Sequence, residues 1–172
     1  MGPINDRDKQ ELIERAVTQA REYFVAAQFN CAESTFWGIA QGLGLPTNEA
    51  LMRVATPFGG GMGDARATCG PLVGAVMALG LVLGRTELDT PRKLVAYDRT
   101  RALYERFVAE AGSDMCRVLN EWGFDRPDLR SHCARFVTLA ARLAATILLT
   151  GDPEADRIAY AQGLQAQSKI DQ

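Results

Sequence analysis

Apolar residues recur at helical spacing along almost the whole chain, and this periodicity limits its fold more than any other feature. Between Asp6 and Phe29 they stand three and four residues apart with charges between them, as on one face of an amphipathic helix. These residues are Leu12, Ile13, Ala16, Val17, Ala20, Tyr23, Phe24 and Ala27. No segment alternates at period two with β-branched enrichment, which would indicate a strand. The sequence therefore predicts an all-α fold, a single-domain helical bundle of about six or seven helices over residues 1–172.

Capping residues, glycines and prolines divide the rest of the chain into further helices. Each expected helix begins after a residue whose side chain can accept from first-turn N–H groups; in chain order these are Asn30, Thr47 or Asn48, Thr68, Thr90, Ser113 or Asp114, and Ser131. The expected ends are Gly42 to Gly44, Thr56–Pro57, Gly112, Gly123 and Gly151. Residues 151–172 are predicted to form a polar C-terminal helix or tail. At the centre of the bundle, residues 69–84 are expected to pack against residues 133–149.

Composition excludes several classes of function. Hydrophobic residues make up 47% and charged residues 23% of the 172 residues, as in a globular protein. A net charge of −2 gives no basic footprint for nucleic acid. The longest uncharged run, residues 69–84, is about one helical turn too short for a bilayer, so we expect no membrane span. The N-terminus lacks a signal-peptide pattern, which favours a cytoplasmic protein, and in that reducing compartment structural disulfides are rare.

Four cysteines, Cys31, Cys69, Cys116 and Cys133, lie close behind expected helix caps. A helix N-terminus stabilises thiolate, which is both the nucleophile and the metal ligand. No two of the four form a C-x-x-C pair, so a thioredoxin-like motif and a zinc ribbon do not fit. Cysteines on separate helices can meet only through tertiary structure. We expect all four sulfurs to lie in one cluster near the glycine-rich segment 58–66; the alternative is that they pack as small apolar side chains.

The residues around these cysteines resemble a named family. Residues 69–74, Cys-Gly-Pro-Leu-Val-Gly, follow the glycine-rich segment and are similar to the CGAxxG element of the C_GCAxxG_C_C family of redox-active proteins. The remaining elements fit in order: Asn30-Cys31-Ala32-Glu33, Met115-Cys116-Arg117 and His132-Cys133. The resemblance covers about residues 10–150 and departs at Pro71, where the family pattern has alanine. It implies a small helical protein with redox activity and names no substrate.

Several chemistries compete for a four-cysteine site. The favoured one is an iron–sulfur cluster, most suitably [2Fe–2S], ligated by all four thiolates and used for electron transfer. Backbone N–H groups of Gly60, Gly61, Gly63 and Gly70 are candidate donors to such a cluster. In the alternative, cysteine pairs cycle through a disulfide, with an attacking thiol whose pKa is lowered by a nearby cation; the candidates are Arg66, Arg117, His132 and Arg135. A structural zinc site and a non-enzymatic helical scaffold complete the alternatives.

Other features point less directly to function, and whether the protein is an enzyme stays undecided. His132 and Cys133 are helix neighbours about 100° apart, which disfavours a catalytic dyad. The glycine-rich segment lacks the lysine of a P-loop. Trp37, Tyr97, Tyr104 and Trp122 fit a core or an interface, and Arg135 and Arg142 form a stripe that can pair with acids on a neighbouring helix. A face of small residues, Gly70, Gly74 and Ala78, allows another helix to approach closely. A homodimer is compatible with such faces, and the redox partner is unknown.

Overall fold

The computed structural model describes residues 5–121, 125 and 127–151, and the regular structure of these residues is helical. The elements are α1 (Asp6–Val25), α2 (Cys31–Leu43), α3 (Glu49–Ala55), the 3-10 turn η1 (Thr56–Phe58), α4 (Gly59–Met62), α5 (Gly70–Leu83), α6 (Thr90–Ala111), α7 (Cys116–Leu119) and α8 (Leu129–Thr150). The turn η1 has three residues, and α4 and α7 have four residues each; the other six elements described are longer helices. The all-α prediction is confirmed: the described ranges contain one isolated β-bridge, Thr68 with Met115, and no strand.

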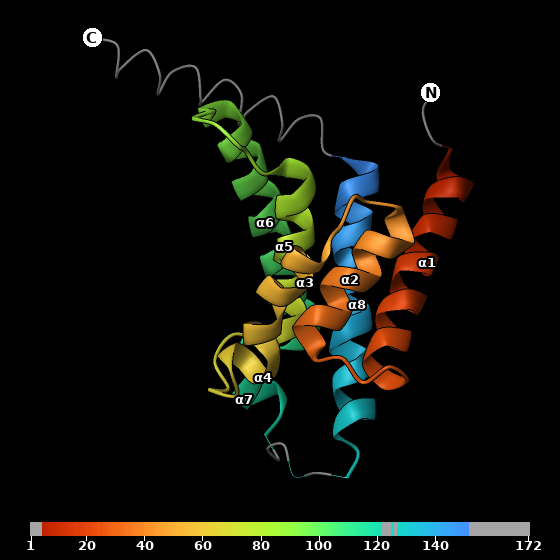
Figure 1. Ribbon diagram of the computed structural model, residues 1–172, viewed down its shortest axis with the longest axis vertical. Helices are drawn as coiled ribbons and strands as arrows, with labels where there is room; N and C mark the ends of the chain where they lie inside the picture. The colour runs from red at the N-terminus through yellow and green to blue at the C-terminus, as the bar shows by residue number, and fades with distance from the viewer. Residues whose placement is uncertain (1–4, 122–124, 126, 152–172) are drawn as a thin grey trace.

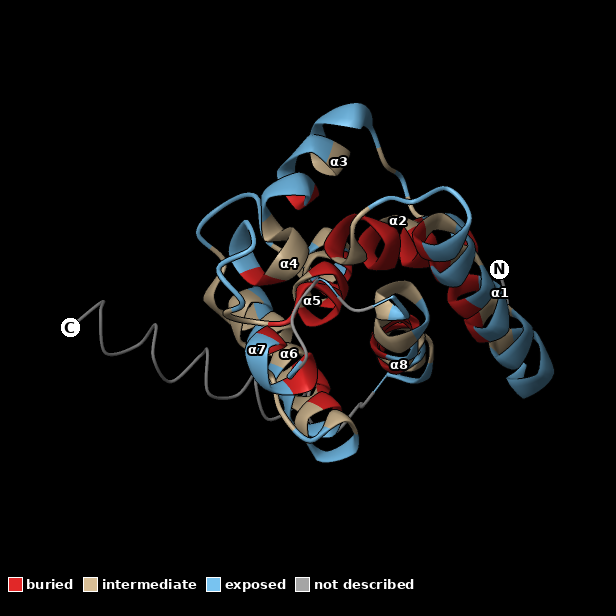
Figure 2. Ribbon diagram, turned by 90° about the horizontal axis from the view of Figure 1, so that it is seen from below, coloured by how far each residue is buried: buried red, intermediate tan, exposed pale blue. Residues whose placement is uncertain are grey.

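Helices α2, α5 and α8 form the centre of the bundle (Figure 1). The predicted packing of α5 against α8 is confirmed, and α2 lies against both, with α1 outside α2 and α8 and with α6 outside α5 and α8. Seen from below, buried α5 lies in the middle of the surrounding helices (Figure 2). The largest fully buried side chains come from α2, α5, α6 and α8, and include Phe36, Ile39, Leu79, Leu103, Phe107 and Val137. These helices therefore share one apolar core.

Glycines set how closely α2 approaches its neighbours. A Cβ at Gly74 of α5 would lie 2.4 Å from the Ala32 carbonyl oxygen of α2. The expected small-residue face of α5 is therefore used, and the helix that it admits is α2. On its other side, a Cβ at Gly38 of α2 would lie 2.3 Å from the Cα of Ala20 in α1. Backbones at such distances leave no room for a side chain at either glycine.

Several helices begin at residues other than the expected ones. Cys69 itself, and not Thr68, is the N-cap of α5. Asp89 replaces Thr90 as the cap of α6, because its carboxylate accepts from the Arg92 N–H at 2.8 Å. Helix α7 follows Met115, whose N–H donates to the Ser113 hydroxyl at 3.0 Å.

The start of α8 is also displaced from the sequence prediction. Asp128 is the N-cap, so that α8 begins at Leu129 and Ser131 already lies inside the helix. The Ser131 hydroxyl donates to the Asp128 carbonyl at 2.9 Å. Cys133 consequently lies in the second turn of α8 and not in the first.

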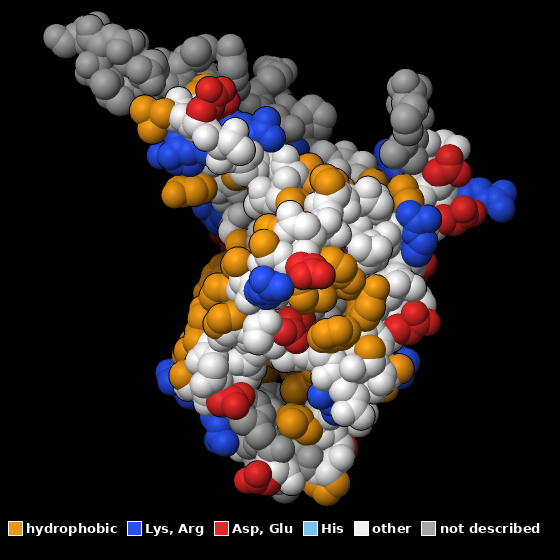
Figure 3. Space-filling view, in the orientation of Figure 1, with side chains coloured by type: hydrophobic (Ala, Val, Ile, Leu, Met, Phe, Trp, Pro, Cys, Tyr) orange, Lys and Arg blue, Asp and Glu red, His pale blue; other side chains and the backbone are white. Residues whose placement is uncertain are grey.

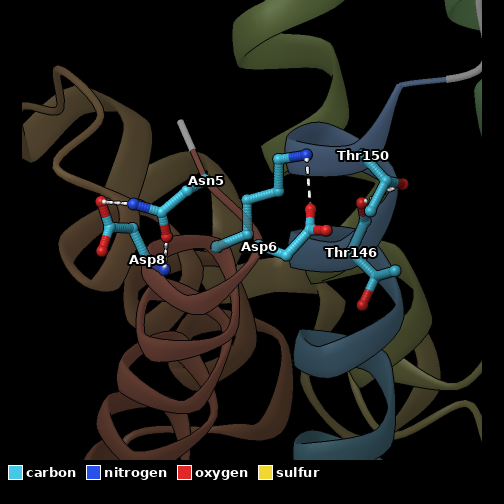
Figure 4. Close-up of polar contacts among 6 residues, drawn as sticks. Asn5, Asp6, Asp8, Thr146 and Thr150 are labelled. Carbon is cyan, nitrogen blue, oxygen red and sulfur yellow. Dashed lines mark hydrogen bonds and ion pairs between the residues drawn. The ribbon is translucent and has the colours of Figure 1, made fainter. Parts of the chain in front are cut away.

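The start of α1 and the end of α8 lie side by side at one end of the bundle, away from α4 and α7 (Figure 1). There Asn5 caps α1 by accepting from the Asp8 N–H at 2.9 Å, and the Thr150 hydroxyl donates to the Thr146 carbonyl at 2.8 Å (Figure 4). Further along the two helices, Arg142 of α8 pairs with Glu14 of α1, with Nη2 and Oε2 3.1 Å apart. This pair confirms the expectation for Arg142.

The surface mixes charged and apolar groups. On the face shown in Figure 3, hydrophobic side chains gather near the middle and along one flank, whereas many of the charged ones lie nearer the two ends. Of the four aromatic residues singled out above, Trp37 is packed against the core, Tyr97 and Tyr104 are exposed, and Trp122 lies outside the described residues. Gly123 and residues 152–172, with the expected C-terminal helix or tail, lie outside them too.

One described helix, α8, is long and apolar enough by length and composition alone to cross a membrane. Half of its apolar window is buried against other parts of the protein. Core helices have this composition as well, so the property is weak evidence for a span.

Candidate functional site

Four thiols from separate segments line one cavity of about 290 Å³ at the end of the bundle that carries α4 and α7. Cys31 is the first residue of α2, Cys69 is the N-cap of α5, Cys116 is the first residue of α7, and Cys133 lies in α8. All four are free thiols. The structure therefore brings together the four cysteines that the sequence singled out, three of them at helix starts.

Cys31 is fixed by a capping box at the start of α2. The Asn30 side-chain oxygen accepts from the N–H groups of Ala32 and Glu33, each at 3.0 Å, and the Glu33 carboxylate accepts from the Asn30 N–H at 2.8 Å. The same carboxylate, which is buried, accepts from the Thr56 hydroxyl at 2.6 Å. Reciprocal bonds of this kind satisfy the unpaired donors of a helix start. They also tie the Cys31 turn to η1.

Cys69 and Cys116 are held side by side by backbone pairing. The Cys69 N–H donates to the Asp114 carbonyl at 2.7 Å, and the Cys116 N–H donates to the Ala67 carbonyl at 2.7 Å. These bonds flank the bridge between Thr68 and Met115. Two cysteines far apart in sequence thus lie next to a short antiparallel backbone contact. The pattern of apolar residues in the sequence does not predict this contact.

The glycine-rich segment wraps one side of the cavity in a left-handed backbone. Gly60 and Gly61 have φ values of 61° and 74°, a region that side-chain-bearing residues rarely adopt. The Gly60 N–H lies near enough to Cys31 to oppose the rise in the pKa of its thiol. A Cβ at Gly61 would lie 2.7 Å from the Cys116 Cβ. The segment therefore approaches two of the four cysteines as closely as backbone can.

The four glycines proposed as backbone donors have different places. Gly60 and Gly70 line the cavity. Gly61 packs against Cys116, and the nearest atom to a Cβ at Gly63 would be the Pro57 carbonyl oxygen, 3.9 Å away. Within the glycine-rich segment, Gly60 and Gly61 thus lie near the cysteines, as expected, and Gly63 does not.

Other side chains complete the cavity, and most of them were not predicted from the sequence. Phe24, Leu129 and Phe136 supply apolar walls, while Asn30, Asp64 and Arg130 supply polar groups. Arg130 had no distinguishing feature in the sequence because the carbonyls that it binds come from residues about a hundred positions away. Pro71, at the position where this chain departs from the family pattern, also lines the cavity.

Burial raises the pKa values of Cys31, Cys69 and Cys116. The pKa of Cys69 lies well above its usual range because of burial and then of the three neighbouring cysteines. Burial and the nearby Cys31 raise the pKa of Cys116 to about 11, against the attraction of Arg66. Burial also raises the pKa of Cys31, although N–H groups of Gly60 and Ala32 oppose the shift. The lowered pKa expected from nearby cations is therefore wrong for these three thiols, because desolvation is the largest effect on each and outweighs Arg66 at Cys116.

The thiols surround a space and do not converge on a point. Within residues 5–121, 125 and 127–151, no group of three or more His, Cys, Asp or Glu side chains is arranged to hold a single metal ion. A tetrahedral zinc site needs four sulfurs at about 2.3 Å from one centre. The described residues therefore form a cavity lined by thiols, but they are not arranged to bind a single zinc ion.

Comparisons with known proteins identify the family. A relative from Archaeoglobus fulgidus, described as an uncharacterized protein, is 29% identical over 127 residues, which cover 69% of this chain and 84% of that protein. No solved structure matches the chain. A family model described as "Putative redox-active protein (C_GCAxxG_C_C)" matches residues 29–147, which is more than half of the chain and includes all four cysteines. The chain therefore belongs to the C_GCAxxG_C_C family.

Proposed function

We propose that the four cysteines together bind one iron–sulfur cluster and that the protein transfers single electrons through it. The observation that carries the proposal is that all four thiols line the same cavity. A cluster of the [2Fe–2S] type, the favoured one, requires four cysteine thiolates. When bound, it accepts one electron from a donor and passes it to an acceptor.

The size of the cavity supports a cluster over a single ion. Four sulfurs at about 2.3 Å from one zinc ion enclose no free volume between them, whereas these thiols lie, with nine other residues, around a cavity of about 290 Å³. A cluster spreads its ligands over more than one iron, so its cysteines need not converge. The donor set is also soft sulfur throughout, which iron–sulfur clusters require.

The chain's own residues supply the surroundings that such a group needs. Phe24 and Phe136 line the cavity with apolar surface, which limits the access of water. The Gly60 N–H favours the thiolate form of Cys31, because it lowers the pKa of that thiol. Hydrogen bonds to ligand sulfurs and a dry environment are two of the factors that set a cluster's reduction potential.

Purification without oxygen tests the proposal. We expect a coloured protein with about two irons and two sulfides per chain for a [2Fe–2S] cluster, and loss of the colour in Cys69→Ser. Gly80→Ala, on the same helix but with open space at its Cβ position, is the matched control and should keep the colour. A colourless preparation that holds one zinc per chain would replace the cluster by a structural ion. A preparation that lacks all metal would refute both.

A thiol–disulfide protein is the second candidate, favoured by one contact. A Cβ at Gly70 would lie 2.5 Å from the Cys31 sulfur, which places that sulfur beside the residue that follows Cys69. If these two thiols pair, each turnover joins two sulfurs and releases two protons and two electrons to a disulfide or quinone acceptor. A metal-free anaerobic protein with a reversible two-electron couple, lost in Cys31→Ser and Cys69→Ser alike, would establish this reading. Metal-free protein without any thiol couple would favour the scaffold.

A further inference from the structure

Arg130, in the first turn of α8, binds the connection between α1 and α2. Its guanidinium group donates to the Phe24 carbonyl at 2.6 Å, the Phe29 carbonyl at 3.0 Å and the Gln28 carbonyl at 3.1 Å. The guanidinium carbon also lies 4.8 Å from the centre of the Phe24 ring. One side chain thus fastens α8 to the chain segment that leads directly into Asn30 and Cys31.

His132 fastens the same part of α8 in another direction. Its Nε2 lies 2.8 Å from the Leu119 carbonyl oxygen, at the end of the short helix that begins with Cys116. Its ring meets the Phe136 ring edge to face, with the centroids 5.7 Å apart. The histidine therefore joins the Cys133 turn to the Cys116 helix.

Cys133 is placed differently from the other cysteines, because it lies in the second turn of a helix and not at a helix start. Cys31 follows a capping box, and the Cys69 and Cys116 backbones are paired with neighbouring segments. Helix α8 begins at Leu129 without a side-chain cap bond from Asp128. The two contacts just described lie one and three residues before Cys133.

We propose that Arg130 and His132 are positioning residues that hold Cys133 at the cavity, Arg130 against the Cys31 side and His132 against the Cys116 side. The inference rests on the four-cysteine site proposed above, but it concerns how the site is closed and not what fills it. Without these contacts the first turns of α8 would no longer be fastened to the α1–α2 connection and to α7. Cys133 would then leave the cavity while the other three cysteines kept their places.

Alkylation of the reduced, metal-free full chain tests the proposal. Iodoacetamide is added, and mass spectrometry follows the labelling of each cysteine, with the ratio of the Cys133 rate to the Cys69 rate as the readout. We expect this ratio to rise at least several-fold in Arg130→Gln and in His132→Ala. His132→Gln, whose amide N–H can still donate to the Leu119 carbonyl, should stay closer to the wild-type ratio, and Arg130→Lys should fall between wild type and Arg130→Gln.

Arg142→Gln is the matched control, because it also removes a contact between α8 and its neighbours, the pair with Glu14, but not at the cavity. It should leave the ratio unchanged even if the protein becomes less stable. Equal acceleration of all four thiols, or an unchanged ratio in both Arg130→Gln and His132→Ala, would overturn the proposal. Because no metal is used, these outcomes are separate from the iron test: wild-type protein without iron refutes the cluster and leaves this inference standing.

Discussion

Replacement of Gly70 by alanine tests the packing that brings α2 and α5 together at the cavity. Gly70 is the first residue of α5, and an added Cβ would lie 2.5 Å from the Cys31 sulfur and 2.9 Å from the Phe58 carbonyl oxygen. Both distances are well below ordinary van der Waals contact. The sulfur can move only by giving up its place in the cavity, and the carbonyl belongs to backbone. Relief therefore requires the start of α5 to move away from η1, which carries the Phe58 carbonyl, and from the Cys31 turn of α2.

The cost can be estimated from overpacked cores. Inserting one methyl group into a filled interior costs about 1–3 kcal/mol. For a chain of this size each kcal/mol lowers the melting temperature by about 2–4 °C, so Gly70→Ala should melt about 2–12 °C below wild type. Gly80→Ala is the control, because nothing lies within 4 Å of its Cβ position on the same helix. There the better helix propensity of alanine should stabilise the protein by up to about 1 kcal/mol.

Thermal unfolding of the metal-free proteins, followed by circular dichroism, measures both effects. Iron content after anaerobic purification then shows whether displacement of Cys31 also weakens the site. If Gly70→Ala melts at or above the wild-type temperature while Gly80→Ala melts below it, the close packing described around Gly70 is refuted.

Two further predictions concern the thiols and the α2 cap. The pKa of Cys116 is raised from about 9 to about 11, so folding favours the neutral thiol. In metal-free protein, the resulting contribution to the free energy of unfolding should be present below pH 9 and lost as the pH rises toward 11. Melting temperatures across that range check the sign, and Cys116→Ala should flatten the profile. Asn30→Ala removes both capping bonds and should cost about 1–2 kcal/mol. Asn30→Asp keeps the cap oxygen, and should therefore recover most of that loss in urea unfolding.

The sequence was sufficient for the helical class and for several helix boundaries, because these depend on local chemistry. Asn30 caps α2, and Gly44 and Gly112 end α2 and α6, as their residue types predict. The start of α8 was misplaced because Ser131 has the residue type of a cap but lies inside the helix, whereas Asp128 precedes the first turn without a side-chain cap bond. Local propensity cannot decide such cases.

In the candidate site too, some features could be predicted from local sequence and others could not. The cysteines and the glycine-rich segment could be named from spacing and residue type. The pairing of Cys69 with Cys116 could not, because it uses backbone groups, which carry no residue-specific signal. Arg130 was missed for a related reason: its partners are carbonyl oxygens of the α1–α2 connection, and any residue offers a carbonyl.

The distribution of the four cysteines along the chain has a consequence for biosynthesis. They lie on four segments between residues 31 and 133, and the last belongs to α8, which ends at Thr150. A ribosome makes the chain from its N-terminus, so α8 emerges after the three segments that carry Cys31, Cys69 and Cys116. Until α8 has emerged, a nascent chain can thus present at most three of the four thiols. Loading of the iron–sulfur cluster proposed above would therefore follow translation of α8, because a chain truncated before α8 lacks Cys133.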